Sequence, residues 1–275
     1  MTIPNAVQAV HVRPKLRALA DALWAAQQTR VAIPQPSTTT NPGLTVTDAY
    51  AVQGANLARR YAAGEKPVGH KVGLTSLAMQ QQLGVDEPDF GVITDAMVTA
   101  NGGTVDPATM LAPKLEAELA FRIGSALSVG PTLEQLRAAI SDVAVAIELI
   151  DSRVEDWKIA LVDTVADNAS SAGIVVGPWA PATDELLDSL PNVVVRLLRD
   201  DEEVAAGPGS AVLGDPLVAL HWLAGAIGAY GQSFKPGDIV LAGAVAASVP
   251  LDPGVTWSAT AEGFDPVVVH SATAQ

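Results

Sequence analysis

After Pro67 the chain changes to short apolar runs separated by glycine and proline, and this punctuation limits the possible folds more than any other feature of the sequence. Short apolar runs bounded by turn-forming residues are typical of β-strands. Because these runs outnumber the helical patterns and do not alternate regularly with them, they disfavour a doubly wound parallel sheet and predict an α+β fold. We expect strands at residues 68–72, 115–122, 143–150, 173–176, 193–198, 239–241 and 267–270.

The first 65 residues have a helical pattern instead. Apolar residues recur every three or four positions within residues 14–28, which predicts an amphipathic helix. A Pro/Ser/Thr-rich stretch at residues 33–43 separates it from a second predicted helix, residues 49–62, for which Thr47 and Asp48 are the expected cap. We therefore expect an N-terminal helical segment at residues 1–65, a mixed β catalytic domain at residues 66–275, and further helices at residues 132–139 and 216–230.

Composition narrows the class of protein and of partner. With 49% apolar and 17% charged residues, a chain of 275 residues can bury a large core, so disorder is disfavoured. The net charge of −14 and the pI near 4.5 argue against nucleic acid or an anionic membrane as a partner. The sequence contains no cysteine, which excludes disulfide frameworks, thiolate zinc sites and cysteine nucleophiles.

No segment of the sequence has the pattern of a secretion signal or a membrane span. Residues 1–16 contain Pro4 and basic side chains instead of the apolar core of a signal peptide. The longest low-charge stretch, residues 216–230, includes His221 and two glycines and is shorter than the roughly 20 residues that cross a bilayer. We expect a soluble cytoplasmic protein.

The most informative local pattern is the run 113–121, which reads Pro-Lys-Leu-Glu-Ala-Glu-Leu-Ala-Phe. On a strand the side chains alternate, so Glu116 and Glu118 stand on one face and the apolar residues on the other. Two carboxylates about 7 Å apart on one face repel each other unless a cation or solvent lies between them. An exposed polar face of a half-buried strand is the structural alternative.

Glu148 lies within the otherwise apolar run 143–150, which implies burial on at least one side. A buried lone carboxylate costs several kcal/mol or keeps its proton unless a positive group pairs with it. A salt bridge to Arg153 or Lys114 is the structural alternative. Three glutamates that offer only oxygen ligands favour a hard divalent ion, Mg²⁺ or Mn²⁺.

Two further segments carry candidate catalytic residues. In the run 69–76 Lys71 lies among apolar and glycine residues at a predicted strand end, where its ammonium can reach a cleft. Residues 87–91 read Glu-Pro-Asp-Phe-Gly, which predicts a turn that carries Asp89 beside an aromatic residue. A bland surface lysine and a simple turn-forming aspartate are the alternatives.

Residues 163–173 form a polar segment of small residues between two apolar runs. Such a segment, which includes Asn168 and Ser170, is typical of a loop that offers hydroxyl and amide donors to a ligand. The sequence lacks the G-x-S-x-G, G-x-x-x-x-G-K and H-E-x-x-H motifs, and we expect no nucleotide cofactor.

Taken together, these segments resemble the hydratase/decarboxylase branch of the fumarylacetoacetate hydrolase superfamily, most closely the hydratases of aromatic meta-cleavage pathways. The resemblance rests on several blocks in the family's order and spans most of the chain. The blocks are residues 69–75 (Gly-His-Lys-Val-Gly-Leu-Thr), 81–91, 113–120, 147–153 and 163–171, with weaker similarity at 214–216 and 222–241.

The resemblance implies a mixed β-sheet roll or sandwich core with an N-terminal helical segment. It also implies a metal-dependent hydratase that adds water to 2-hydroxypenta-2,4-dienoate (2-oxopent-4-enoate) and gives 4-hydroxy-2-oxopentanoate. In this reading Glu116, Glu118 and Glu148 hold Mg²⁺ or Mn²⁺.

The same resemblance assigns roles to the remaining candidates. Lys71 is a catalytic or substrate-orienting residue, Asp89 is an acid/base residue, and Ser170 lines the pocket. The implied partners are a small anionic 2-oxo- or 2-hydroxydienoate, further copies of the chain in a homo-oligomer, and a decarboxylase or aldolase of the same pathway.

The sequence departs from the family pattern near its end, where Gly254-Val255 replaces a Gly-Asp pair and Asp265-Pro266 replaces a Gly-Ser pair. Residues 243–248 are also more apolar than in many relatives. These differences bear on the pocket wall and therefore on the exact substrate.

Three other functions remain open. A 4-oxalocrotonate decarboxylase of the same family would use a similar enolate-stabilising site. A hydrolase of the acylpyruvate type would need a His-x-x-Glu pair, which none of the four histidines provides. A non-catalytic partner subunit of a hydratase-decarboxylase complex is the third, and the intact candidate residues argue against it.

Overall fold

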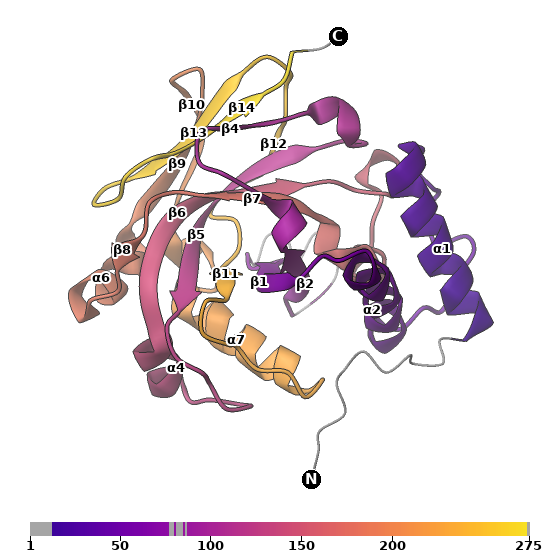
Figure 1. Ribbon diagram of the computed structural model, residues 1–275, viewed down its shortest axis with the longest axis horizontal. Coiled ribbons are helices and arrows are strands. Elements are labelled where there is room, and N and C mark those ends of the chain that lie inside the picture. Colours follow the sequence, from indigo (N-terminus) through magenta and orange to yellow (C-terminus); the bar gives the residue numbers. More distant parts are fainter. Residues whose placement is uncertain (1–12, 77–79, 81–84, 86, 274–275) are drawn as a thin grey trace.

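Two β-sheets face each other across the main hydrophobic core in the computed structural model, which describes residues 13–76, 80, 85 and 87–273 (Figure 1). Residues 1–12 and, within the block 81–91, residues 81–84 and 86 lie outside the described residues. Helices flank the sheets, and the strands are mostly antiparallel, which confirms the predicted α+β class.

The larger sheet has nine strands within the described residues, in the order β2-β1-β11-β5-β6-β7-β3, with β12 on β5 and β8 on β6. Only the pairs β1 with β11 and β3 with β7 are parallel. Its strands are β1 (Pro67–Gly73), β2 (Asp89–Thr94), β3 (Val98–Thr99), β5 (Lys114–Ile123), β6 (Ile140–Ile150), β7 (Ser171–Val176), β8 (Ala180–Pro181), β11 (Ile239–Leu241) and β12 (Val249–Pro250).

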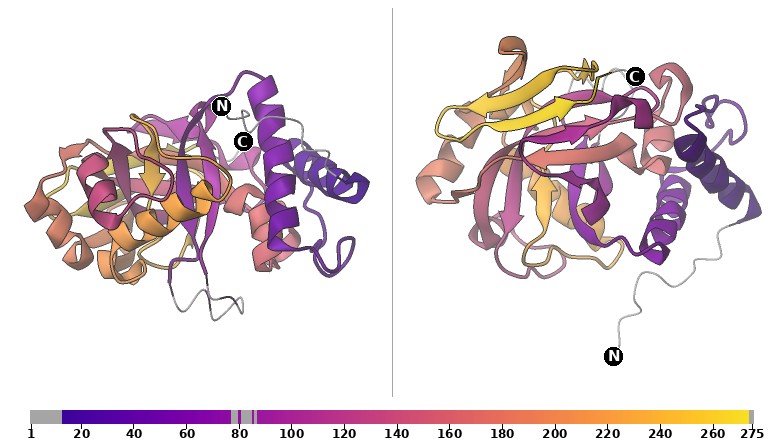
Figure 2. Two further views of the ribbon diagram at one scale, coloured as in Figure 1. Left: turned by 90° about the horizontal axis from the view of Figure 1, so that it is seen from below. Right: turned by 45° about the horizontal axis from the view of Figure 1, so that its top comes forward.

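The smaller sheet lies over one face of the larger one (Figures 1 and 2). Its order in the described part of the chain is β10-β9-β13-β14-β4. Its strands are β4 (Gly103–Val105), β9 (Val194–Arg199), β10 (Glu202–Pro208), β13 (Thr256–Ala261) and β14 (Val267–Ser271).

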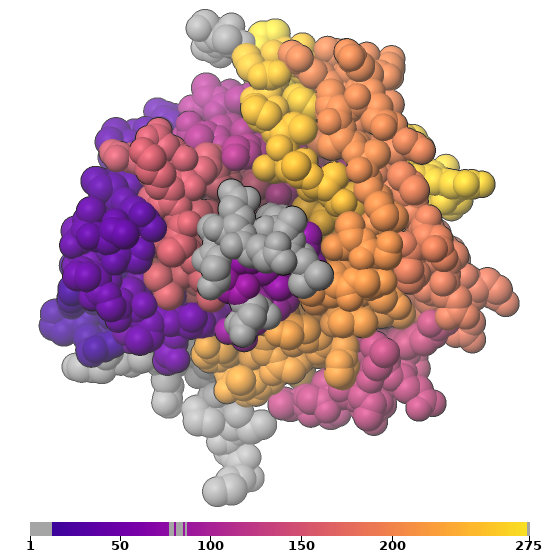
Figure 3. Space-filling view, turned by 180° about the vertical axis from the view of Figure 1, so that it is seen from behind, coloured from indigo at the N-terminus to yellow at the C-terminus, as the bar shows by residue number. Residues whose placement is uncertain are grey.

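Six helices of the described residues surround the sheets. They are α1 (Pro14–Thr29), α2 (Val46–Ala62), α4 (Leu133–Ala139), α5 (Leu161–Ala166), α6 (Asp184–Ser189) and α7 (Pro216–Gly228). Asp215 caps helix α7, because its side chain accepts a hydrogen bond from Leu217 N, and proline occupies the first helical position. Seen from behind, the N-terminal helices (indigo) and the C-terminal third (orange to yellow) lie on opposite sides of the molecule (Figure 3).

The period-2 pattern of β5 and β6 explains the main core. Leu115 and Phe121 on β5 and Val145 on β6 are buried on the face toward the smaller sheet, where they meet Leu197 and Trp257. The other face of the same two strands is also buried, so β5 and β6 form the centre of the molecule. That second face carries the charged residues considered below.

The sequence predictions hold for the long elements and fail for several short ones. Every predicted strand and helix is present, with ends that differ by a few residues. Helix α2 begins at Val46, with Thr45 as its cap, so the cap predicted at Thr47 and Asp48 is wrong; Thr45 Oγ1 accepts a hydrogen bond from Asp48 N. The sequence does not predict the strands β2, β3, β4, β8, β10, β12 and β13 or the helices α5 and α6.

The stretch Gly209–Gly228 is long and apolar enough, by length and composition, to cross a membrane. Only its second part is α-helix, namely α7. Leu217, Leu220, Leu223 and Ile227 of α7 are buried in the main core, so protein already covers this apolar surface.

The helices α1 and α2 pack on the β domain through a second apolar cluster. Leu19 and Leu23 of α1 and Val52 of α2 meet Val154 and Val165 in this cluster. Figure 2 shows both helices beside the sheets and away from the smaller sheet. The division at residue 65 stays a prediction, and these contacts attach the helical segment firmly to the rest.

Candidate active site

Three glutamates meet on the buried second face of β5 and β6. In the antiparallel register Glu116 lies directly opposite Glu148, and Glu118 lies opposite Ala146 on the same face. One carboxylate oxygen of each glutamate lies within 4.8 Å of one from each of the others. Their exposed fractions are 6%, 0% and 0%, so the alternative of an exposed polar strand face is wrong.

The electrostatics of this cluster favour a bound cation. Burial, together with the neighbouring Glu148, raises the pKa of Glu116 to about 7. Burial also raises the pKa of Glu118 and of Glu148. Glu118 Oε1 and Glu148 Oε1 are buried without a hydrogen-bond partner in the described structure, whereas Glu118 Oε2 accepts a hydrogen bond from Gly243 N at 2.8 Å. Oxygen-only donors in this arrangement can hold a hard divalent metal ion.

Lys71 provides the positive charge beside this cluster. Its Nζ lies 3.4 Å from Glu148 Oε2 and donates a hydrogen bond to the carbonyl oxygen of Ala169 at 3.0 Å. Burial alone would lower the pKa of Lys71, but the carboxylates of Glu148, Asp89 and Glu116 outweigh burial and raise it. Lys71 is therefore a buried, charged ammonium and not a surface lysine.

The ion pairs predicted for Glu148 as a structural alternative are wrong. Arg153 forms a buried pair with Asp167, with Nε donating to Oδ1 at 2.5 Å. The Nζ atom of Lys114 lies over the ring of Trp157, 4.4 Å from the ring centroid. Sequence reasoning missed Lys71 as the partner because the pairing joins residues far apart in the chain.

Asp89 is the first residue of β2, opposite Gly73 of β1, so the predicted turn at residues 87–91 is wrong from Asp89 onward. A β-carbon built on Gly73 would lie 2.1 Å from Asp89 Oδ1 and 3.3 Å from Lys71 Nζ. The two side chains therefore meet over the bare backbone of Gly73. Burial raises the pKa of Asp89, while Lys71 and a hydrogen bond from the Thr164 side chain lower it.

The segment predicted as a polar loop is only partly irregular. Its beginning belongs to α5 and its end to β7, with a tight turn at Asn168–Ser170 between them. Ser170 Oγ lies 3.2 Å from Thr164 Oγ1. The Asn168 side chain accepts from Val92 N and donates to Val92 O, both at 2.9 Å, so the backbone of β2 engages both of its polar atoms.

Helix α2 reaches the site through two residues that sequence reasoning missed. Gln53 Nε2 donates to the carbonyl oxygens of Phe90 and Val165 at 3.0 and 3.2 Å. Tyr50 accepts a hydrogen bond from Phe90 N at 3.3 Å and stacks on the Phe90 ring at 4.5 Å. No local sequence signal marks these residues, because their partners lie on β2 and α5.

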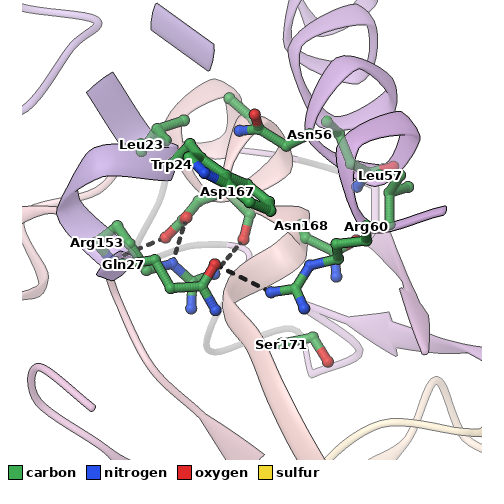
Figure 4. Close-up of a pocket in the computed structure, with 12 residues that line it drawn as sticks. Leu23, Trp24, Gln27, Asn56, Leu57, Arg60, Arg153, Asp167, Asn168 and Ser171 are labelled. Carbon is green, nitrogen blue, oxygen red and sulfur yellow. Dashed lines mark hydrogen bonds and ion pairs between the residues drawn. The ribbon is translucent and has the colours of Figure 1, made fainter. Parts of the chain in front are cut away.

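A separate cleft lies between α1, α2 and the segment after β6, and none of the three glutamates lines it (Figure 4). Arg153, Asp167 and Asn168 line it from the β domain, and Arg60 and Gln27 line it from the helices. The chemistry described above therefore belongs to the buried carboxylates and not to this cleft.

Comparison with known proteins gives a consistent family. The family model for the fumarylacetoacetate (FAA) hydrolase C-terminal domain matches residues 62–270. A 2-keto-4-pentenoate hydratase from Paraburkholderia xenovorans (strain LB400) is 41% identical over 249 residues, covering 90% of this chain and 91% of the relative. A 2-hydroxyhexa-2,4-dienoate hydratase from Comamonas testosteroni is 39% identical over 232 residues, covering 83% and 87%.

Among solved structures, the chain is similar to 4-oxalocrotonate decarboxylase from Pseudomonas putida G7 in complex with magnesium and adipate. The TM-score is 0.87 and the sequence identity 35%, with 94% of this chain and 98% of that chain covered.

Proposed function

The chain belongs to the fumarylacetoacetate hydrolase family, and from that premise we propose that it is a metal-dependent hydratase of 2-hydroxypenta-2,4-dienoate, with 4-hydroxy-2-oxopentanoate as the product. One observation carries the proposal: three buried glutamates converge beside a buried ammonium in a chain that is about 40% identical to dienoate hydratases. The substrate is a small anion of the kind such a site binds once a cation is present.

Glu116, Glu118 and Glu148 are the proposed ligands of Mg²⁺ or Mn²⁺. The bound ion supplies a Lewis acid that stabilises negative charge on an enolate oxygen. Gly243 N fixes Glu118 through its hydrogen bond to Oε2, so this carboxylate is oriented before any ligand binds. The site needs that positive charge, since Lys71 faces four buried carboxyl groups, Glu148, Asp89, Glu116 and Glu118, in a protein of net charge −14.

Lys71 and Asp89 are the proposed catalytic residues. The ammonium of Lys71 is charged and held between Glu148 and Ala169, where it can bind the carboxylate or the charged oxygen of the substrate. Ketonisation of the dienol delivers a proton to the far carbon, and water then adds at C4 with a proton to C3. Burial raises the pKa of Asp89. Asp89 is therefore the group proposed to transfer a proton in these steps or to position the water.

The contacts of the polar segment separate the two candidate substrate-binding residues. Ser170 remains the proposed substrate contact, because its hydroxyl is buried and lies 3.2 Å from the hydroxyl of Thr164, whose side chain also hydrogen-bonds Asp89. Both polar atoms of the Asn168 side chain are already engaged by Val92. A role for Asn168 in holding the site is therefore favoured over direct contact with substrate.

A 4-oxalocrotonate decarboxylase is the second candidate, because a decarboxylase is structurally similar over 94% of the chain. The experiment is to incubate the protein and Mg²⁺ with 2-hydroxypenta-2,4-dienoate and, separately, with 4-oxalocrotonate. The loss of substrate absorbance is followed and the product is identified. A hydroxyketo acid without CO₂ supports the hydratase, and release of CO₂ supports the decarboxylase. Loss of neither substrate, with the protein folded and metal present, would contradict both.

The remaining features of the proposed function concern setting and partners. We expect a cytoplasmic enzyme that acts without nucleic acid or membrane, because the chain is strongly acidic and its most apolar helix is buried in its own core. A homo-oligomer, and association with a decarboxylase or aldolase of the same pathway, are further expectations. Sedimentation of the protein alone, and of the protein mixed with such an enzyme, tests them.

A further inference from the structure

Three consecutive residues beside the site have left-handed backbone conformations although none is glycine. Asn168, Ala169 and Ser170 have φ values of 57°, 51° and 55°. A left-handed conformation costs an L-residue roughly 1–2 kcal/mol. Such strain persists only where the surrounding contacts impose it, and it is concentrated at functional sites.

The contacts that impose this conformation come from three sides. On one side the amide of Asn168 is paired in both directions with the backbone of Val92. On another, the carbonyl oxygen of Ser170 accepts from Asp151 N at 2.8 Å. Just before the turn, Asp167 is anchored by the buried pair with Arg153 (Figure 4).

The turn directs one backbone carbonyl at the ammonium of Lys71. Ala169 O accepts from Lys71 Nζ at 3.0 Å, while Glu148 Oε2 lies 3.4 Å from the same nitrogen. The turn also packs tightly on β2, because a β-carbon on Gly91 would lie 2.5 Å from Asn168 O and 3.3 Å from Lys71 Cγ. Turn, strand and lysine stem therefore form one packed unit.

From these contacts we propose that the left-handed turn Asn168–Ser170 is a positioning device for Lys71 and that Asn168 is its positioning residue. A lysine stem is flexible and its ammonium has three donors. Without a second acceptor, attraction would draw the ammonium fully onto Glu148. The Ala169 carbonyl accepts a hydrogen bond from the ammonium at 3.0 Å and so holds it 3.4 Å from Glu148 Oε2. The catalytic consequence rests on the proposed function, in which Lys71 contacts the substrate.

Two variants loosen the turn in different ways. Asn168→Ala removes the pairing with Val92, and Ala169→Gly keeps the carbonyl but frees its backbone. Displacement of a catalytic group by about 1 Å can cost about 100-fold in rate. We expect both variants to lose 10-fold to 100-fold in kcat at temperatures well below unfolding, with Mn²⁺ affinity within about twofold of wild type. A merely structural role would lower the melting temperature and leave kcat intact below it.

The matched control is Asp201→Gly. Asp201 is an exposed residue with φ of 69° in the hairpin between β9 and β10, outside the site. This variant also replaces a left-handed non-glycine residue by glycine. We expect its kcat to stay at the wild-type value.

A second readout does not depend on turnover. Reductive methylation followed by peptide mass spectrometry measures the accessibility of Lys71 against Lys158, whose side chain is 70% exposed. We expect Lys71 to react at least fivefold faster in Asn168→Ala and Ala169→Gly than in the wild type, and unchanged in Asp201→Gly.

Labelling or kcat that stays at the wild-type value in both turn variants overturns the proposal. If one variant does not fold, the other decides. Absence of dienoate turnover by the wild type would instead contradict the proposed function, and the labelling result would still decide whether the turn holds Lys71.

Discussion

The protonation of individual carboxyl groups governs the stability of the site. Burial raises the pKa of Glu116 to about 7 from its usual 4.5, so the metal-free folded protein binds a proton that the unfolded chain releases. This contribution is fully present below pH 4.5 and is lost as the pH rises through about 7. For Glu116 alone it amounts to about 3 kcal/mol.

A bound divalent ion replaces that proton, so we expect the metal to stabilise the protein more at high pH. The measurement is thermal unfolding with saturating Mg²⁺ and with EDTA, at pH 6 and at pH 8.5. The increase in melting temperature caused by the metal should be larger at pH 8.5. Equal increases at both pH values would show that the carboxylates do not exchange protons for the ion.

Gly73 leaves the space in which Asp89 and Lys71 meet. In Gly73→Ala the new β-carbon would lie 2.1 Å from Asp89 Oδ1, so the carboxylate must move. We expect kcat to fall about 100-fold while Mn²⁺ affinity changes little. Gly54→Ala in α2 is the control, because a β-carbon there meets nothing within 4 Å and alanine favours the helix. Wild-type kcat in Gly73→Ala would remove Asp89 from the mechanism.

Thr164 tunes the acidity of Asp89. Its hydrogen bond favours the charged carboxylate, so removal of the hydroxyl in Thr164→Val raises the pKa of Asp89. We expect the acid limb of the kcat/KM profile to move to higher pH in Thr164→Val and to stay in place in Thr164→Ser. The same limb in both variants would indicate that Asp89 does not control this ionisation.

At the scale of elements, α2 supports the strand that carries Asp89. Gln53 is 4% exposed, and Gln53→Leu leaves two buried carbonyl oxygens, on Phe90 and Val165, without their donor. Such a loss costs about 1–3 kcal/mol. We expect the free energy of unfolding, measured with urea, to fall by that amount, whereas the exposed Gln28→Leu in α1 should change it by less than about 0.5 kcal/mol. Equal stability of the two variants would show that α2 does not hold β2.

The elements that sequence reasoning predicted are those whose pattern is local. Strands β5 and β6 and helix α7 are long apolar runs, and period-2 alternation alone places Glu116 and Glu118 on one face. Strand β10 is charged and largely exposed, and β13 is rich in serine, threonine and alanine, so neither has an apolar run. Strand β2 was mistaken for a turn because Pro88 and Gly91 flank Asp89.

The types of residue in the sequence identify the candidates for the site, but they do not predict which of these residues contact one another. A carboxylate inside an apolar run marks Glu148 from the sequence, but its pairing with Lys71 depends on contacts between distant strands. The sequence marks Asn168 only as a residue with an amide, because its hydrogen-bond partner Val92 lies 76 residues away. The need for glycine at residue 73 is set by the Asp89 side chain on the neighbouring strand.

For the whole molecule, two packed sheets give a rigid frame in which distant segments meet. The larger sheet places Glu116, Glu118 and Glu148 on its two central strands, and β1 with β2 brings Lys71 and Asp89 to the same face. Helix α2 holds β2 through the hydrogen bond from Gln53 to Phe90 O. This arrangement gathers four buried carboxyl groups around the ammonium of Lys71 in a chain of net charge −14, which favours the binding of a further cation.

The central claim is that the three glutamates hold one divalent ion, and calorimetric titration of chelator-stripped protein with Mn²⁺ tests it most directly. We expect one ion per chain in the wild type and at least about tenfold weaker binding in Glu148→Gln. The exposed Glu185→Gln in α6 should leave binding unchanged. Saturable binding of undiminished affinity in Glu148→Gln, or no saturable binding by the wild type, would contradict the claim.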